Sequence, residues 1–93
     1  MTQLTGHFDT RNGSKYLQQL CKHFGHKIET SHNESEGQCQ FAFGTAWLRA
    51  DDAGLTVQFD LQAEEARDQA KGVIDSHLER FAFREGFSAM QWQ

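Results

Sequence analysis

The stretch YLQQLCKHFGHK, residues 16–27, carries the clearest structural pattern in this chain. Its apolar side chains recur at positions i, i+3, i+4 and i+7, which is the spacing of one face of an α-helix. These side chains are Leu17, Leu20, Cys21 and Phe24. We therefore predict a helix that opens near Ser14, after a polar break over residues 10–13, and that ends at Gly25.

Alternation of apolar and polar residues, which is typical of strands with one buried face, occurs on both sides of this helix. It is cleanest over residues 55–61, where Leu55, Val57, Phe59 and Leu61 share one face. Five strands are predicted before a second helix, over residues 4–9, 28–32, 38–43, 45–51 and 55–61. A polar turn is predicted over residues 33–37, and hairpin turns suit Gly44-Thr45 and residues 52–54, so the last four strands form a meander.

A second helix is predicted to begin near Ala63, with Glu64 and Glu65 in its first turn, where the helix dipole favours acidic side chains. Its predicted apolar stripe consists of Ala63, Ala66, Ala70, Val73, Ile74, His77 and Phe81. Phe83 is expected to join the core. The tail, residues 87–93, is apolar enough for a closing strand.

The predicted order is therefore strand, helix, four strands, helix, strand. An antiparallel sheet with one polar face and two amphipathic helices buries its apolar surface only if both helices cover the apolar face. We predict a single α+β domain over residues 1–93, with two layers and a curved antiparallel sheet. This order is similar to the TATA-binding-protein-like arrangement, with one strand added.

Composition narrows the possible functions. The chain has 93 residues and a formal net charge of -4, so the overall attraction to phosphate on which most nucleic-acid binding depends is absent. Two cysteines are too few for a disulfide framework, and no apolar run suits a membrane span or a leader segment. We expect a cytoplasmic protein that binds neither nucleic acid nor membrane. No cofactor motif is recognisable.

A cationic cluster at the end of the first predicted helix is the first candidate site. It consists of Lys22, His23, His26 and Lys27. Cations at this end of a helix complement its dipole and bind its last carbonyl groups, which is a purely structural role. The alternative is a site for an anionic ligand. His23 and His26 have a spacing that two metal ligands can have, but no third ligand follows at a diagnostic spacing, so no metal site is predicted.

His77 falls within the apolar stripe of the second helix, so we expect it to be buried. A hydrogen-bonded core histidine is the simplest interpretation, and a metal or haem ligand and a general base are the alternatives. Arg80 and Arg84 either form a solvated helix end or contact an anion. Because the helices are expected to run antiparallel, the cationic cluster and this arginine pair are predicted at opposite ends of the domain, and Cys21 is predicted to lie apart from His77.

Trp47 is predicted to lie on the outward, polar face of the sheet, between Thr45 and Arg49. An exposed tryptophan in this setting is more typical of a protein contact than of a ligand platform. A homodimer formed through the open sheet face is therefore one alternative.

Three segments give the chain a resemblance to a known family: YLQQLCKHFGHK, then FAFG followed by LRADDAGLTVQFD, and finally HLERFAFREGFSAMQWQ. Together they resemble a small bacterial family known only as a conserved domain of unknown function. Relatives of this kind stand alone or are joined to flavin-dependent siderophore-interacting proteins. The resemblance implies a link to iron or siderophore handling and to a flavoprotein partner, and it assigns no functional residues.

The leading hypothesis is a non-catalytic binding module for a small anionic ligand or a protein partner, in iron-siderophore or haem metabolism. Its candidate contacts are Lys22, His23, His26, Lys27, Arg80 and Arg84, with His77 as a buried polar candidate. The alternative from another class is a small enzyme that uses His77 in a pocket between a helix and the sheet.

Overall fold

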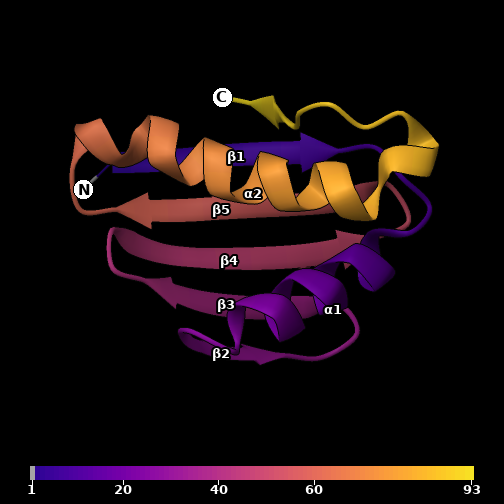
Figure 1. Ribbon diagram of the computed structural model, residues 1–93, viewed down its shortest axis with the longest axis horizontal. Coiled ribbons are helices and arrows are strands. Elements are labelled where there is room, and N and C mark those ends of the chain that lie inside the picture. Colours follow the sequence, from indigo (N-terminus) through magenta and orange to yellow (C-terminus); the bar gives the residue numbers. More distant parts are fainter. Residues whose placement is uncertain (1) are drawn as a thin grey trace.

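The computed structural model describes residues 2–93 and contains the predicted order of elements (Figure 1). The strand β1 (Thr2–Phe8) and the helix α1 (Gly13–Phe24) precede a four-stranded meander. The meander consists of β2 (Glu29–His32), β3 (Glu36–Phe41), β4 (Gly44–Asp51) and β5 (Gly54–Leu61). The 3₁₀ turn η1 (Glu64–Ala66) then leads into α2 (Arg67–Phe81), and the 3₁₀ turn η2 (Phe83–Glu85) leads to β6 (Gln91–Trp92).

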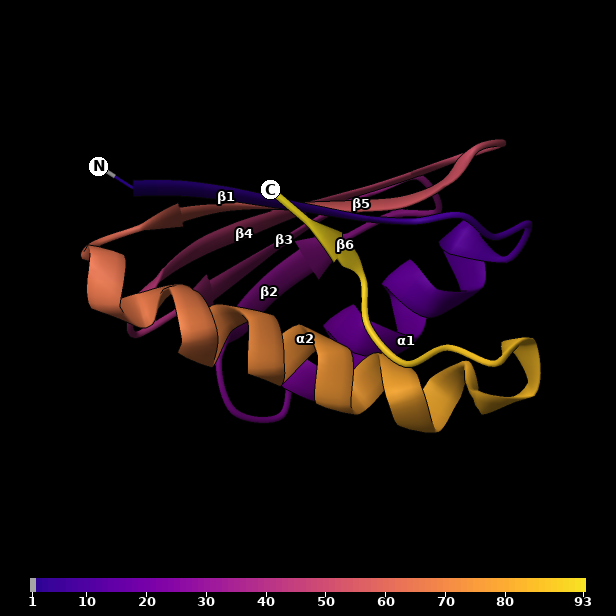
Figure 2. The ribbon, with the colours of Figure 1, turned by 90° about the horizontal axis from the view of Figure 1, so that it is seen from above.

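All strands join one antiparallel sheet in the order β2-β3-β4-β5-β1-β6. Both helices lie on one face of this sheet, and the other face is open (Figure 2). The helices run in opposite directions, as predicted (Figure 1). The predicted two-layer α+β architecture is therefore confirmed. Among residues 2–93, no helix is long and apolar enough to cross a membrane.

The core lies between the helices and the sheet. The predicted face of α1 is confirmed, because Leu17, Leu20 and Cys21 are fully buried. α1 packs tightly on β3 at Gly37, where an added Cβ would lie 2.8 Å from Cys21 Sγ. This packing fixes the distance of α1 from the sheet, and therefore helps to position the cationic residues at the C-terminal end of the helix.

The buried stripe of α2 differs from the predicted one. Ala70, Ile74 and Leu78 are fully buried, whereas Val73 and His77 are only partly buried. The reason is that α2 packs on α1, while Ala70, Ile74 and Leu78 join the core that lies over the sheet. The side of α2 that faces the sheet is therefore the line through Ala70, Ile74 and Leu78, and His77 lies at the seam between the helices.

Two predictions near the C-terminus also need correction. Phe83, expected in the core, is 65 % exposed because α2 ends at Phe81 and the helical spacing does not continue into η2. The closing strand expected over residues 87–93 is present only as Gln91–Trp92. The tail is held instead by the Asp75 carboxylate of α2, which accepts hydrogen bonds from the Met90 backbone N–H at 3.0 Å and from Trp92 Nε1–H at 2.9 Å.

The turn between β3 and β4 lies earlier than predicted. Residues 42–43 form the turn, and Gly44 pairs with Phe41 in the ladder. Gly44 has a φ of 153°, and an added Cβ would lie 2.4 Å from the Asp60 carbonyl oxygen, so this position requires glycine. The glycine therefore marks the first residue of a strand and not the turn itself.

Candidate functional site

The structure brings together histidines from both helices. His23 lies in the last turn of α1, and His77 is in the second half of α2. Their ring centroids are 4.5 Å apart, with 55° between the ring planes. The two rings also contact Phe24, whose ring lies 5.7 Å from that of His23 and 4.9 Å from that of His77. The helix ends that were predicted to lie apart therefore meet on one surface.

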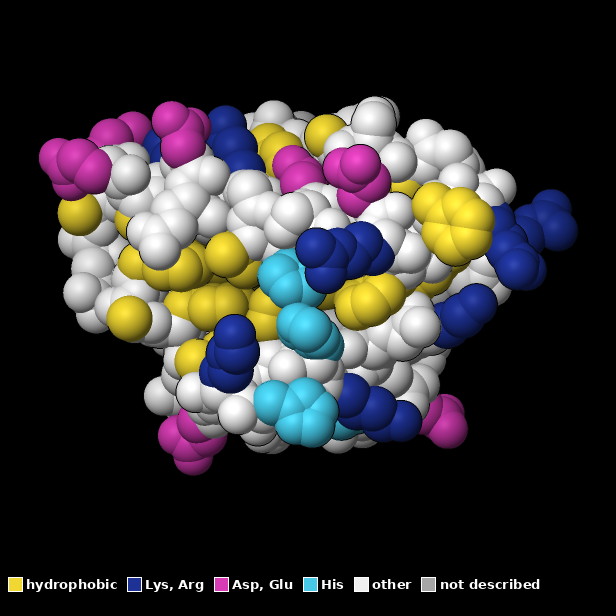
Figure 3. Space-filling view, viewed as in Figure 1, with side chains coloured by type: hydrophobic (Ala, Val, Ile, Leu, Met, Phe, Trp, Pro, Cys, Tyr) yellow, Lys and Arg dark blue, Asp and Glu magenta, His cyan; other side chains and the backbone are white. Residues whose placement is uncertain are grey.

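The helix directions were predicted correctly, but their consequence was not. α1 has 12 residues and α2 has 15, so α1 ends before it passes the whole length of its partner. The C-terminal end of α1 therefore reaches the third turn of α2, where His77 lies. The space-filling view shows the result on the helical face, where the histidines form a row flanked by lysine and arginine side chains (Figure 3).

Positive groups surround His23. Burial lowers its pKa first, and the charges of His77, His26, Lys27 and Arg80 lower the pKa further. All four of these neighbours disfavour a proton on His23, and no carboxylate opposes them. We call the five residues His23, His26, Lys27, His77 and Arg80 the histidine patch.

The end of α1 folds back so that His26 and Lys27 stay near His23. After Phe24 the chain continues in a tight turn, in which the Gly25 N–H donates to the Cys21 carbonyl at 2.9 Å. The N–H groups of His26 and Lys27 donate to the carbonyls of His23 and Phe24, at 3.3 Å and 2.9 Å. The predicted structural role of this segment, a helix end rich in cations, is thus compatible with its place in the patch.

His77 is held by its own helix. Its Nδ1 lies 2.6 Å from the Val73 carbonyl oxygen. Because a carbonyl only accepts, Nδ1 carries the proton, and Nε2 is the nitrogen left for another partner. The hydrogen bond expected for this ring is therefore present, but the side chain is only partly buried, and not fully buried as predicted. His77 lines neither the hollow of about 520 Å³ nor the one of about 70 Å³ that residues 2–93 form, so these hollows do not supply the pocket that the enzyme alternative requires.

Two predicted contacts stand outside the patch. Lys22 is exposed in the last turn of α1 and does not contribute to the lowered pKa of His23. Arg84 lies in η2, and its guanidinium group is 5.7 Å from the centre of the Phe83 ring. Among residues 2–93, no three His, Cys, Asp or Glu side chains are arranged to hold a metal ion. The chemistry of the patch is therefore that of a cationic surface with hydrogen-bond donors.

The sequence analysis did not identify the role of Glu85, whose carboxylate connects segments near the two ends of the chain. Glu85 accepts hydrogen bonds from Thr10 Oγ1 at 2.7 Å, from Asn12 Nδ2 at 3.0 Å and from Tyr16 Oη. These bonds lower the pKa of Glu85, while burial and Glu85 raise the pKa of Tyr16 to about 12. We call these four residues the Glu85 clamp. The two pKa shifts keep Tyr16 neutral and Glu85 charged, which suits a structural role for this pair and does not suit proton transfer between them.

A second missed contact joins the two cysteines. The Sγ atoms of Cys21 and Cys39 are 3.9 Å apart, and both side chains are fully buried as free thiols. The alternation in β3 predicts that Cys39 faces inward, but only the tertiary packing of α1 on β3 brings it to Cys21.

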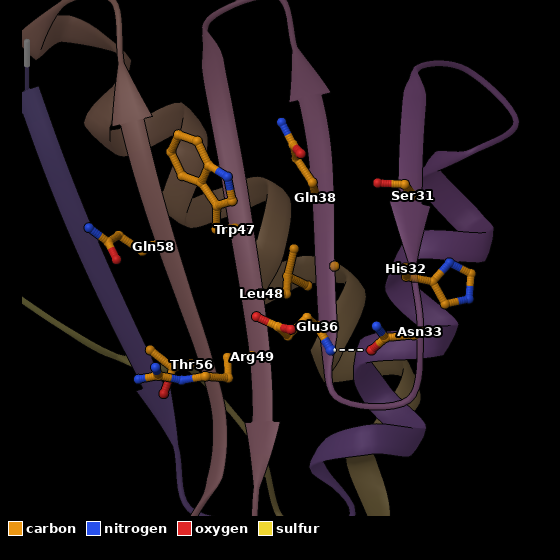
Figure 4. Close-up of a pocket in the computed structure, with 11 residues that line it drawn as sticks. Ser31, His32, Asn33, Glu36, Gln38, Trp47, Leu48, Arg49, Thr56 and Gln58 are labelled. Atoms are coloured by element: carbon orange, nitrogen blue, oxygen red, sulfur yellow. Dashed lines mark hydrogen bonds between the residues drawn. The ribbon is translucent and has the colours of Figure 1, made fainter.

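The open face of the sheet carries a hollow of about 520 Å³ (Figure 4). Trp47 lies in it and is 43 % exposed, as its predicted outward position requires. Polar side chains from four strands line the rest, among them Ser31, Gln38, Arg49 and Gln58. The sequence predicted the face of Trp47 but not the hollow, because the concavity comes from the twist of the whole sheet.

Comparison with known proteins places the chain in a family. No curated protein sequence matches it. A solved structure, the NMR structure of PA4090 from Pseudomonas aeruginosa, is similar with a TM-score of 0.81 and 28 % sequence identity, and the match covers 100 % of this chain and 96 % of that one. Residues 5–93 match the family described as "Uncharacterized protein conserved in bacteria (DUF2218)". The chain therefore belongs to this bacterial family of uncharacterized proteins.

Proposed function

We propose that the protein is a non-catalytic binding module whose histidine patch holds a small anionic ligand. The contact between His23 and His77, with Lys27 and Arg80 beside it, is the observation that carries this proposal. Cationic side chains that repel one another are costly to keep together, and a bound anion relieves that repulsion. Arginine and imidazolium also donate directional hydrogen bonds to carboxylate and phosphate oxygens.

The ligand class follows from the same residues. Charges contributed by two helices suit a ligand with several anionic groups better than a single small ion. Within this class, a ferric siderophore with carboxylate or catecholate groups and the propionates of haem are the ligands that connect to iron handling. That connection and a flavoprotein partner come from the family resemblance in the sequence, and the cytoplasmic location comes from the composition of the chain. The anion-binding chemistry is independent of all three.

Anion binding at this patch should strengthen as the pH falls. The pKa of His23 is lowered, so its imidazole is neutral at pH 7 in the free protein. A bound anion favours the protonated ring, so binding takes up a proton, and an anion whose own charge is constant over this range binds more tightly at about pH 5.5 than at about pH 7.5. A site made only of lysine and arginine would take up no proton in this range.

The test is a titration of the protein with citrate, inorganic phosphate and a ferric siderophore, followed by the NMR signals of the histidine rings. We expect His23, His26 and His77 to shift together. Arg80→Gln and Lys27→Gln should each weaken binding about two- to fivefold, because each removes one exposed charge. Arg11→Gln removes an equally exposed charge outside the patch and serves as the matched control.

Two results would separate the parts of the proposal. If citrate and phosphate bind but the ferric siderophore binds no better, the link to iron is wrong and the anion-binding module stands. If no titrant shifts the histidine signals, or if Arg11→Gln weakens binding as much as Arg80→Gln, the patch is only a cationic helix end.

A further inference from the structure

We infer that the hollow on the open sheet face binds a neutral sugar ring, stacked on Trp47 and hydrogen-bonded by Gln38 and Gln58. This site lies on the face opposite the helices and does not depend on the histidine patch. Its volume of about 520 Å³ falls within the range of small-molecule sites.

Trp47 supplies the apolar surface of the proposed site. Its indole occupies a position on β4 where the neighbouring outward residues, Thr45 and Arg49, are polar. Figure 4 shows the indole above the sheet, level with Gln38 on the adjacent strand. A large flat ring with a negative face suits the C–H face of a pyranose, because that side of a sugar is apolar and carries a weak positive potential.

Amide side chains lie on both sides of Trp47. In the register of the sheet, Trp47 pairs with Gln38 of β3 and with Gln58 of β5. A primary amide offers one acceptor oxygen and two N–H donors, and a sugar hydroxyl both donates and accepts. Within residues 2–93, no hydrogen bond joins either amide to another residue, so both have their full capacity free for a ligand.

The charges around the hollow favour a neutral ligand. The lining holds one carboxylate, Glu36, and one guanidinium group, Arg49, so its formal charge is zero when His32 is neutral. His32, the other titratable residue of the lining, has its ring turned away from Trp47 (Figure 4). A phosphate or carboxylate ligand would find no net positive charge here, in contrast to the histidine patch.

Other occupants fit this face less well. A stable interface with a second copy of the chain buries about 800 Å² per partner around an apolar centre. Among residues 2–93, Trp47 is the one large hydrophobic side chain exposed on this face, since Phe83 lies in η2. A single-stranded nucleic acid would need a basic groove beside the stacking ring, and Arg49 is the single arginine or lysine among the residues that line the hollow.

The test uses the two tryptophans as signal and control. The ¹⁵N-labelled protein is titrated with D-glucose, N-acetyl-D-glucosamine and cellobiose, and the indole N–H signals are followed. We expect the Trp47 signal to shift along a saturable curve with at least one of these sugars. The Trp92 signal should not move, because its Nε1–H is bound to Asp75 on the helical side.

Variants then test the assigned roles. Trp47→Ala should abolish binding while the rest of the spectrum is unchanged, because the side chain is exposed. Gln38→Ala and Gln58→Ala should each weaken binding about three- to tenfold, as expected for the loss of one or two hydrogen bonds. Gln62→Ala, an exposed glutamine outside the hollow, should bind as the wild type does.

Four outcomes would overturn the inference. The Trp47 signal could fail to move with all three sugars, or Trp92 could move equally. The Trp47 signal could shift on concentrating the protein without sugar, which would identify a second copy as the occupant. It could also respond to a nucleotide and not to the sugars.

Discussion

Removing the carboxylate of Glu85 should be the most destabilising single change on the surface of this protein. Glu85 is exposed, yet its two oxygens accept three hydrogen bonds from the β1–α1 connection and from α1. The Glu85 clamp therefore ties η2, near the end of the chain, to a segment about seventy residues earlier. In Glu85→Ala all three donors lose their partner at once.

The magnitude follows from the number and the exposure of these bonds. A hydrogen bond to a charged group contributes about 1.5–3 kcal/mol net when it is buried, and about 1 kcal/mol when water can replace it. Because Glu85 is exposed, we take the lower value for each of its three bonds, which gives about 3 kcal/mol for Glu85→Ala. Tyr16→Phe removes one bond, so it should cost about 1 kcal/mol and lower the Tm by about 4–8 °C.

The assay is urea unfolding of the wild type, of both single variants and of the double variant Tyr16→Phe/Glu85→Ala. Residues that share a hydrogen bond show non-additive effects, so the double variant should be less destabilised than the sum of the single variants by about 1 kcal/mol. Glu79→Ala, an exposed glutamate on α2 with no assigned contact, should change stability by less than about 0.5 kcal/mol.

The pH dependence provides an independent check. The hydrogen bonds lower the pKa of Glu85 in the folded state below its usual value of 4.5. The unfolded state therefore takes up this proton first, and the stabilisation is fully present above pH 4.5 and lost as the pH falls through the lower, folded pKa. The difference in stability between the wild type and Glu85→Ala should narrow at low pH. A penalty no larger than that of Glu79→Ala, additive single variants, or a difference that does not depend on pH would refute this reasoning.

Further predictions concern glycines. Gly37→Ala should destabilise the protein by about 1–3 kcal/mol through overpacking, because its Cβ would lie 2.8 Å from Cys21 Sγ. Adding Cys21→Ala should restore part of that loss, as measured by urea unfolding of the double variant. Gly72→Ala should stabilise the protein by about 0.5–1 kcal/mol, since Gly72 lies within α2 and has open space around it. Gly86 has equally open surroundings but a φ of 71°, so Gly86→Ala should instead lower the free energy of unfolding by about 1–2 kcal/mol and with it the thermal midpoint. A stabilising effect would contradict the assigned conformation.

Periodicity was sufficient to predict the layers of this fold. The spacing of Leu17, Leu20 and Cys21 identified the buried face of α1, and the alternation in β5 identified the face that the helices cover. These patterns are local consequences of helix and strand geometry, so they do not depend on the rest of the chain. The direction of each helix followed from the alternation of elements along the chain.

Contacts between elements could not be predicted in the same way. His77 shares a helical face with Ile74 in the sequence pattern, but its exposure depends on how α2 packs against α1. The meeting of His23 and His77 depends on the lengths of the helices and on where they lie across the sheet, which no spacing encodes. The same is true of Glu85, whose partners lie at the other end of the chain and whose own segment is typical of a solvated helix end.

Both borders of the sheet end in unusually short strands. β2 has four residues, so the border that it forms offers few unpaired backbone groups to a neighbouring chain. At the other border, β6 pairs with Gly6 and His7 of the seven-residue β1, and the first residues of β1 are not paired with it. β2 also carries Glu29, and Glu34 follows in the next loop, so two approaching copies would repel each other at that border. Growth into fibrils by edge-to-edge addition is therefore disfavoured at the β2 border, although the long central strands β4 and β5 would make strong templates if they were ever uncovered.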